Sequence, residues 1–70
     1  MPKLPARSPR QVARLLEEQG FVLDRAKGSH HIYYHPETGR RVVVPMHKED
    51  LPVGTLLSIL KQAGLERDDL

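Results

Sequence analysis

The segment Gly28-Ser29-His30-His31 combines residues that can do acid–base chemistry with a backbone that can approach a ligand closely. Histidine is the side chain that most readily both accepts and donates a proton near neutral pH. Gly28 has no Cβ, so the chain can turn sharply there or lie close to a bound group. The segment therefore predicts a small active site that uses His30. The alternative is a structural histidine beside a glycine turn.

Basic residues are concentrated in the first two-thirds of the chain. Residues 1–48 contain nine Lys and Arg against four Asp and Glu, a charge of +5, and residues 49–70 contain two against five, a charge of −3. A basic body attracts an anionic polymer such as nucleic acid. Ordinary solvated lysines and arginines would give the same count, so charge alone leaves both interpretations open.

Length and composition limit the class of protein. A chain of 70 residues predicts one domain over residues 1–70, near the lower limit for a single apolar core. The sequence has no cysteine, which excludes disulfides and thiolate zinc sites and favours the cytoplasm over secretion. No run of residues approaches the ~18 apolar positions of a membrane span, and residues 1–8 lack the apolar core of a signal peptide. We expect a cytoplasmic protein with no membrane contact.

Two amphipathic helices are predicted, one on each side of the central segment. Ser8-Pro9-Arg10-Gln11 is typical of a helix start, with a capping serine, a proline at the first helical position and a glutamine three residues after the cap. Gly20 is placed to end this helix, and a second helix runs from about Pro52 to Gly64. Residues 65–70 are expected to fray. The predicted apolar faces are Val12, Leu15 and Leu16 in the first helix, and Val53, Leu56, Leu57, Ile59, Leu60 and Ala63 in the second.

Three short segments between the helices have the pattern of β-strands, over residues 21–26, 30–35 and 40–45. Turn residues separate them at Lys27-Gly28 and at Pro36-Glu37-Thr38-Gly39. In the first segment, alternation places Phe21, Leu23 and Arg25 on one face. The predicted fold is α+β with the order α-β-β-β-α, a three-stranded antiparallel sheet with both helices on one face and the other face open.

The length of the second turn fixes the strand register. A four-residue loop pairs His35 with Arg40, which places His30 opposite Pro45. His47 then becomes a diagonal neighbour of His30 on the same face, at roughly 7 to 8 Å. The two histidines could flank a phosphate as base and acid. A surface histidine at a strand end is the alternative for His47.

The register does not settle which face of the middle strand is buried. Tyr33 and Tyr34 point to opposite faces, so one belongs to the core and the other to the open face. Burying Ile32 would also turn His30 inward, because the two residues share a face. Either tyrosine could stack on a nucleotide base if it lies on the open face.

Several short motifs occur in a distinctive order along nearly the whole chain. They are Gly20-Phe21, Arg25, Gly28-Ser29-His30, Val44-Pro45 with His47, and Gly54-Thr55-Leu56 followed by Ile59-Leu60-Lys61-Gln62-Ala63-Gly64. In this order and spacing the chain resembles the HicA toxin family of YcfA-like small proteins. The resemblance implies a double-stranded-RNA-binding-like fold, endoribonuclease activity against mRNA and a partner antitoxin of the HicB type. It also implies that His30, in the Gly-Ser-His motif, is the catalytic histidine.

The residues around His30 suit such a reaction. RNA carries its own nucleophile, the 2′-hydroxyl, so an enzyme that deprotonates it and stabilises the phosphorane needs no metal. Neutral His30 would act as the general base. The predicted ligands of the RNA phosphate are Lys27, Gly28, Ser29, Arg40 and Arg41, through side-chain cations and backbone N–H groups. The hydroxyl of Ser29 could instead cap the turn.

The histidine spacing argues against a metal site. His30 and His31 point to opposite faces, and His31 and His35 lie about 13 Å apart along a strand, too far to share a zinc ion. No metal or other cofactor is predicted. Two non-catalytic functions remain as alternatives: a small RNA-binding module that recognises duplex shape, and an adaptor that docks to another protein.

Overall fold

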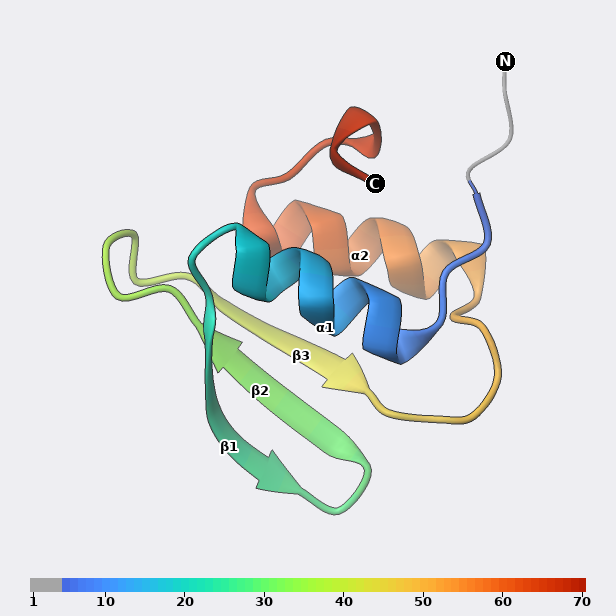
Figure 1. Cartoon of the computed structure of the whole chain (residues 1–70), viewed down its shortest axis with the longest axis horizontal. Coiled ribbons are helices and arrows are strands. Elements are labelled where there is room, and N and C mark those ends of the chain that lie inside the picture. The colour runs from blue at the N-terminus through green and yellow to red at the C-terminus, as the bar shows by residue number, and fades with distance from the viewer. Residues whose placement is uncertain (1–4) are drawn as a thin grey trace.

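A computed structural model of the protein describes residues 5–70 and has the element order α-β-β-β-α (Figure 1). The elements are α1 (Pro9–Glu18), β1 (Val22–Lys27), β2 (His30–Tyr34), β3 (Arg41–Pro45), α2 (Val53–Ala63) and a short 3₁₀ helix, η1 (Arg67–Asp69). The strands form one antiparallel sheet in the order β1-β2-β3, so β2 is central. The predicted α+β class and strand order are confirmed. No helix within residues 5–70 is long and apolar enough to cross a membrane.

The start of α1 and the end of α2 follow the predicted capping chemistry. The Gln11 N–H donates to Ser8 Oγ at 3.2 Å, and the Ser8 N–H donates to Gln11 Oε1 at 2.8 Å. This reciprocal capping box satisfies two donors that would otherwise lack partners at the start of α1. At the end of α2, Gly64 adopts a left-handed conformation with φ +72°, which glycine reaches without the Cβ clash of other residues.

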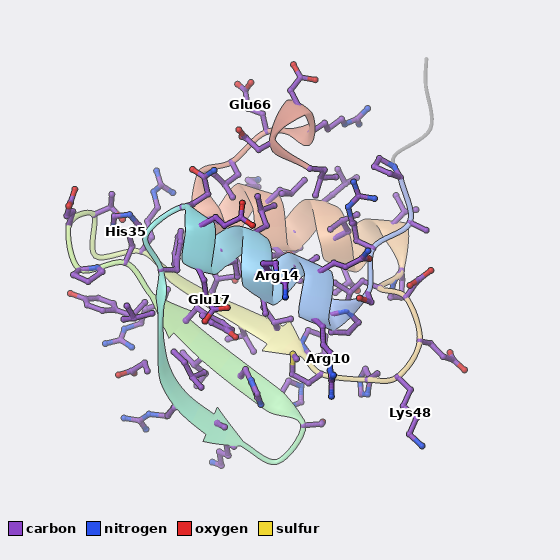
Figure 2. The ribbon with its side chains drawn as sticks, viewed as in Figure 1. Arg10, Arg14, Glu17, His35, Lys48 and Glu66 are labelled. Atoms are coloured by element: carbon purple, nitrogen blue, oxygen red, sulfur yellow. The ribbon has the colours of Figure 1, made fainter. Side chains whose placement is uncertain are left out.

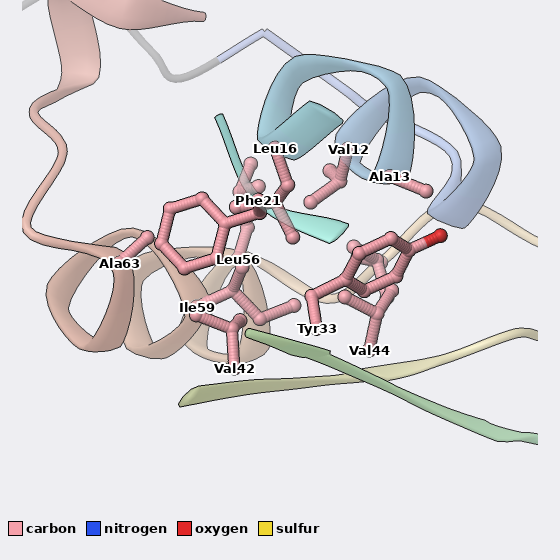
Figure 3. Close-up of a cluster of buried hydrophobic side chains, with 11 residues drawn as sticks. Val12, Ala13, Leu16, Phe21, Tyr33, Val42, Val44, Leu56, Ile59 and Ala63 are labelled. Carbon is pink, nitrogen blue, oxygen red and sulfur yellow. The ribbon is translucent and has the colours of Figure 1, made fainter. Parts of the chain in front are cut away.

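The core lies between the two helices and one face of the sheet (Figure 3). The strands contribute Tyr33, Val42 and Val44 to it, and the Tyr33 side chain is only 4% exposed. The helices and the α1–β1 connection contribute Val12, Ala13, Leu16, Phe21, Leu56, Ile59 and Ala63. Because Tyr33 is buried, alternation along β2 turns Ile32 and Tyr34 to the open face. His30 shares that open face.

The predicted register between β2 and β3 is confirmed. His30 lies opposite Pro45 and Tyr33 lies opposite Val42. β2 ends at Tyr34, one residue earlier than predicted, but the His35 N–H still donates to the Arg40 carbonyl at 2.9 Å. The four-residue turn therefore sets the pairing as its length predicted.

A β-bulge in β1 corrects the predicted alternation of that strand. Leu23 pairs with Tyr33 and Arg25 pairs with Ile32, which leaves Asp24 as an extra residue between the two pairs. A bulge inserts one residue into one strand and reverses the alternation beyond it. Leu23 and Arg25 consequently lie on opposite faces, not on the same face as the sequence pattern predicted. The helices do not cover β1, all of whose residues are exposed.

The C-terminal segment was expected to fray, and this prediction is wrong. Residues 67–69 form the 3₁₀ helix η1, which begins with a hydrogen bond from the Glu66 N–H to Asp69 Oδ2 at 2.7 Å. Leu65 and Leu70 pack against the hydrophobic core as partly buried side chains. Burial of these two leucines gives the segment a tertiary contact that local sequence signals do not show.

Candidate functional site

The β1–β2 hairpin ends in a two-residue turn that presents His30. Lys27 pairs with His30, and Gly28-Ser29 forms the turn between them. Gly28 has φ +59°, and a glycine with positive φ at the first turn position is typical of a type II′ hairpin turn. The Met46 N–H donates to the Ser29 carbonyl at 2.6 Å, which ties the turn to the chain beyond β3. All four residues from Lys27 to His30 are exposed.

His30 therefore lies at one corner of the open sheet face, with a cation on the neighbouring strand. Directly opposed residues in a sheet have Cβ atoms about 5 Å apart, so the Lys27 ammonium can reach the same bound group as the His30 imidazole. Three rows of cross-strand partners form this face: Lys27, His30 and Pro45; Arg25, Ile32 and Val43; and Val22, Tyr34 and Arg41. The structure thus brings together four of the predicted site residues, Lys27, Gly28, Ser29 and His30.

Arg41 lies on the same face but at the far end of the sheet. Its partner Tyr34 is four residues from His30, a distance of about 13 Å along the strand. The Arg41 Nη1 donates to Asp24 Oδ2 at 2.8 Å, and its guanidinium carbon lies 4.7 Å from the centre of the Tyr34 ring. Asp24 is the extra residue of the bulge, and its carboxylate reaches across β2 to β3. Arg41 is therefore engaged with Asp24 and Tyr34, away from His30.

Arg40 is also distant from the histidine. Its Nη1 donates to the Gln62 carbonyl at 3.4 Å, near the C-terminal end of α2. The guanidinium lies so close to Gly64 that a Cβ there would be 2.9 Å from Arg40 Cζ. A cation beside the last carbonyls of a helix interacts favourably with the helix dipole. Arg40 thus contributes to the end of α2, and the structure does not place it with Lys27 and His30.

His35 has a structural environment. Its Nε2 lies 3.0 Å from the Gln19 carbonyl, and its Nδ1 accepts the N–H groups of Glu37 and Thr38 at 3.2 and 3.3 Å. These partners require the neutral tautomer with the proton on Nε2. The ring also meets Phe21 edge to face, with centroids 5.0 Å apart. His35 joins the end of α1 to the β2–β3 turn, at the opposite end of β2 from His30 (Figure 2).

His47 lies two residues beyond the end of β3, in the connection to α2. β3 ends at Pro45, and the chain turns there, with the His47 N–H donating to the Pro45 carbonyl at 3.1 Å. His47 lines a hollow of about 480 Å³ together with His31. The full lining is Ser8, Pro9, Arg10, His31, Met46, His47 and Lys48. The Met46 N–H bond to the Ser29 carbonyl continues the register one residue beyond Pro45. The place of His47 as a diagonal neighbour of His30 stays a prediction.

Tyr33 is a titratable group that the fold buries. Burial raises the pKa of the Tyr33 hydroxyl, and the negative charge of Glu17 raises it further. Figure 3 shows the Tyr33 ring beneath α1 on the core side of the sheet. The phenol therefore stays protonated through the neutral range and lies on the opposite side of the sheet from His30. Among residues 5–70, no three His, Asp or Glu side chains come together as a metal-binding group.

The fold and the site define a small α+β domain whose open sheet face presents an accessible histidine beside a lysine. The family model for the HicA toxin of bacterial toxin–antitoxin systems matches residues 9–65, which includes both helices and all three strands. The chain belongs to the HicA toxin family, and its role is that of the toxin in a toxin–antitoxin pair. A search of the curated proteins finds no match for the chain.

Proposed function

We propose that this toxin is a metal-independent endoribonuclease that cleaves mRNA, with His30 as the general base and a HicB-type antitoxin as its partner. The observation that supports this most directly is the position of His30. It is exposed on the open face, at a glycine turn and directly opposite Lys27. A general base, a cation and the backbone of the glycine turn thus lie together at one accessible place.

The reaction follows from the chemistry of RNA. The neutral His30 imidazole takes the proton of a 2′-hydroxyl as that oxygen attacks the adjacent phosphorus. A bond forms between O2′ and phosphorus, and the bond from phosphorus to the 5′-oxygen of the next nucleotide breaks. The leaving oxygen takes a proton from water or from an acidic side chain, and the His30 imidazolium later releases its proton to water. The products are a 2′,3′-cyclic phosphate and a 5′-hydroxyl. Lys27, with the turn at Gly28 and Ser29, stabilises the negative charge that develops on the phosphoryl oxygens.

The remaining predicted residues have less direct roles in this proposal. Arg41 and Arg40 would contact phosphates further along the RNA, because both lie at the other end of the sheet from His30. Arg41 already forms an ion pair with Asp24, so a bound phosphate would share the guanidinium with that carboxylate. His47 as the acid that protonates the leaving oxygen stays a prediction, which loss of cleavage in His47→Asn would support.

The test is cleavage of an unstructured RNA by the purified full chain, with and without excess EDTA. Undiminished cleavage in EDTA is expected, because the substrate supplies the nucleophile. His30→Ala should lower the rate by about 10²- to 10⁴-fold, the usual contribution of a general base. Loss of cleavage in EDTA that a divalent cation restores would contradict the proposal, as would a fully active His30→Ala variant.

A matched pair of lysine variants tests the cation. Lys27→Gln should slow cleavage, whereas Lys61→Gln, an exposed lysine on α2, should not. Equal rates for the two variants would remove Lys27 from the mechanism. RNA binding without cleavage would favour a non-catalytic RNA-binding module, and the absence of both would favour a protein-docking adaptor.

A further inference from the structure

The hollow defined by Ser8–Arg10, His31 and Met46–Lys48 gathers basic groups from three separate segments. Arg10 lies in the first turn of α1, His31 in β2, and His47 and Lys48 in the connection from β3 to α2. Arg10 and Lys48 lie at the same end of the molecule in Figure 2. The volume of about 480 Å³ is within the range of about 300–1,000 Å³ for clefts that take small ligands.

The charge of the hollow is uncompensated. Its lining contains no acidic residue, although Glu49 and Asp50 follow Lys48 in the chain. The ion pairs recorded within residues 5–70 join Asp24 to Arg25 and Arg41, at the far end of the sheet. Arg10 and Lys48 thus remain available to an anion in this part of the structure.

Side chains supply most of the positive charge that lines the hollow. In the first turn of α1 the Gln11 N–H is bonded to Ser8 Oγ, the Val12 N–H is bonded to the Ser8 carbonyl, and Pro9 has no N–H to offer. The Arg10 N–H is the remaining backbone donor of this turn, and it adds to the attraction of the cations Arg10 and Lys48 and of the ring N–H groups of the histidines. Pro9 and Met46 supply the apolar part of the lining.

The hollow lies next to the proposed active site on the other side of the sheet. His30 and His31 are adjacent in β2, and their side chains point to opposite faces. The turn at Gly28-Ser29 and the chain at Met46 separate the two places, joined by the hydrogen bond from the Met46 N–H to the Ser29 carbonyl. The way from His30 to the hollow therefore leads around this end of the sheet.

The geometry points to the hollow as a second RNA contact, which binds a backbone phosphate flanking the one cleaved at His30. Arg10 and Lys48 supply charge, and His31 and His47 supply hydrogen-bond donors from the rings. This inference rests on the proposed function, since it takes RNA as the ligand. It assigns a binding contact to His31 and His47.

The test is binding of a single-stranded RNA oligonucleotide with 2′-O-methyl groups, which cannot be cleaved, to the full chain over a range of salt concentrations. Arg10→Gln and Lys48→Gln should each weaken binding and reduce the log–log salt slope by about 0.7, the value for one lost phosphate contact on a single strand. When the salt concentration rises fourfold, the RNA affinity of each variant should therefore fall by a factor about 2.6 times smaller than that of the wild type. Lys61→Gln is the control and should keep the wild-type slope. Both hollow residues are exposed, so the variants should fold.

Ring resonances of His31 and His47 in NMR spectra should shift when the RNA is added, and by less when inorganic phosphate alone is added. Salt slopes for Arg10→Gln and Lys48→Gln equal to that of Lys61→Gln would overturn the inference. So would ring shifts that appear with inorganic phosphate but not with RNA. The binding assay requires no catalysis. Its result therefore tests the hollow even if the chain does not cleave RNA at His30.

Discussion

His35 and His30 lie at opposite ends of the β2 segment, and their replacement by alanine should have different effects. His35→Ala should lower the stability of the fold, and His30→Ala should remove cleavage of RNA. For His35→Ala the loss can be summed from its contacts. The Nε2 bond to the Gln19 carbonyl and the shared acceptance by Nδ1 each contribute about 0.5–1.5 kcal/mol, and the edge-to-face contact with Phe21 contributes a similar amount. These three contributions sum to about 1.5–4.5 kcal/mol, and we expect the free energy of unfolding to fall by about 2–4 kcal/mol, the middle of that range.

That loss is large for this chain. A domain of 70 residues has a total stability of about 3.5–10 kcal/mol. The melting temperature should therefore fall by about 8–30 °C, since 1 kcal/mol shifts a domain of this size by about 4–8 °C. Urea unfolding followed by circular dichroism measures the free energy directly. His30→Ala in the same assay should change stability by less than about 0.5 kcal/mol, because its side chain is exposed, while cleavage is lost.

Gly20 gives a second measurement of the same contact. Its φ is +97°, and a Cβ added there would lie 2.8 Å from His35 Nε2. Gly20→Ala should displace the imidazole from the Gln19 carbonyl, so its effect should be smaller in a His35→Ala background. If His35→Ala unfolds at the wild-type urea concentration, or if the two substitutions are fully additive, the structural role assigned to His35 is wrong.

Three further predictions concern the core, the buried tyrosine and the partner. Leu16→Ala removes a fully buried side chain and should cost about 2–5 kcal/mol in urea unfolding, with a cost below about 1 kcal/mol contradicting its placement. The raised pKa of Tyr33 means that the folded chain holds this proton more tightly than the unfolded chain, so stability should be full below about pH 10 and decline as the pH rises through the raised pKa. Glu17→Gln should lower that pKa, and a tyrosinate absorbance titration in a Tyr34→Phe background would show no change if Glu17 were irrelevant. The antitoxin should cover His30 with an interface of about 800 Å² per partner, and an equimolar mixture that still cuts RNA at full rate would exclude masking.

The local signals predicted the fold well because they agree with one another. The capping box at Ser8 fixed the start of α1, and the four-residue turn fixed the pairing of His30 with Pro45. Both depend on residues close in sequence, for which turn and cap chemistry is specific. The bulge at Asp24 could not be predicted in this way. Its carboxylate meets Arg41, 17 residues away and on a strand that is not its neighbour.

The buried face of β2 is ambiguous from the residues of that strand alone, because Ile32 and Tyr33 are both suited to a core. The register between β2 and β3 resolves the ambiguity. It pairs Tyr33 and its face with Val42 and Val44, whereas the face of Ile32 receives only Val43. Two β-branched residues against one favour the face that the structure buries. The β3 residues that pair with β2 thus predict that His30 lies on the open face, and alternation within β2 alone does not predict it.

The hollow escaped prediction for a different reason. Its basic residues come from positions 10, 31, 47 and 48, and no short motif contains more than two of them. Only the packing of α1 over the sheet and the turn after Pro45 bring them together. The chain leaves the strand after Pro45, and the residues that follow, Met46 to Lys48, supply part of the lining of the hollow. The adjacent histidines of the Gly-Ser-His-His segment consequently serve different faces: His30 faces the open sheet with Lys27, and His31 faces the hollow with His47.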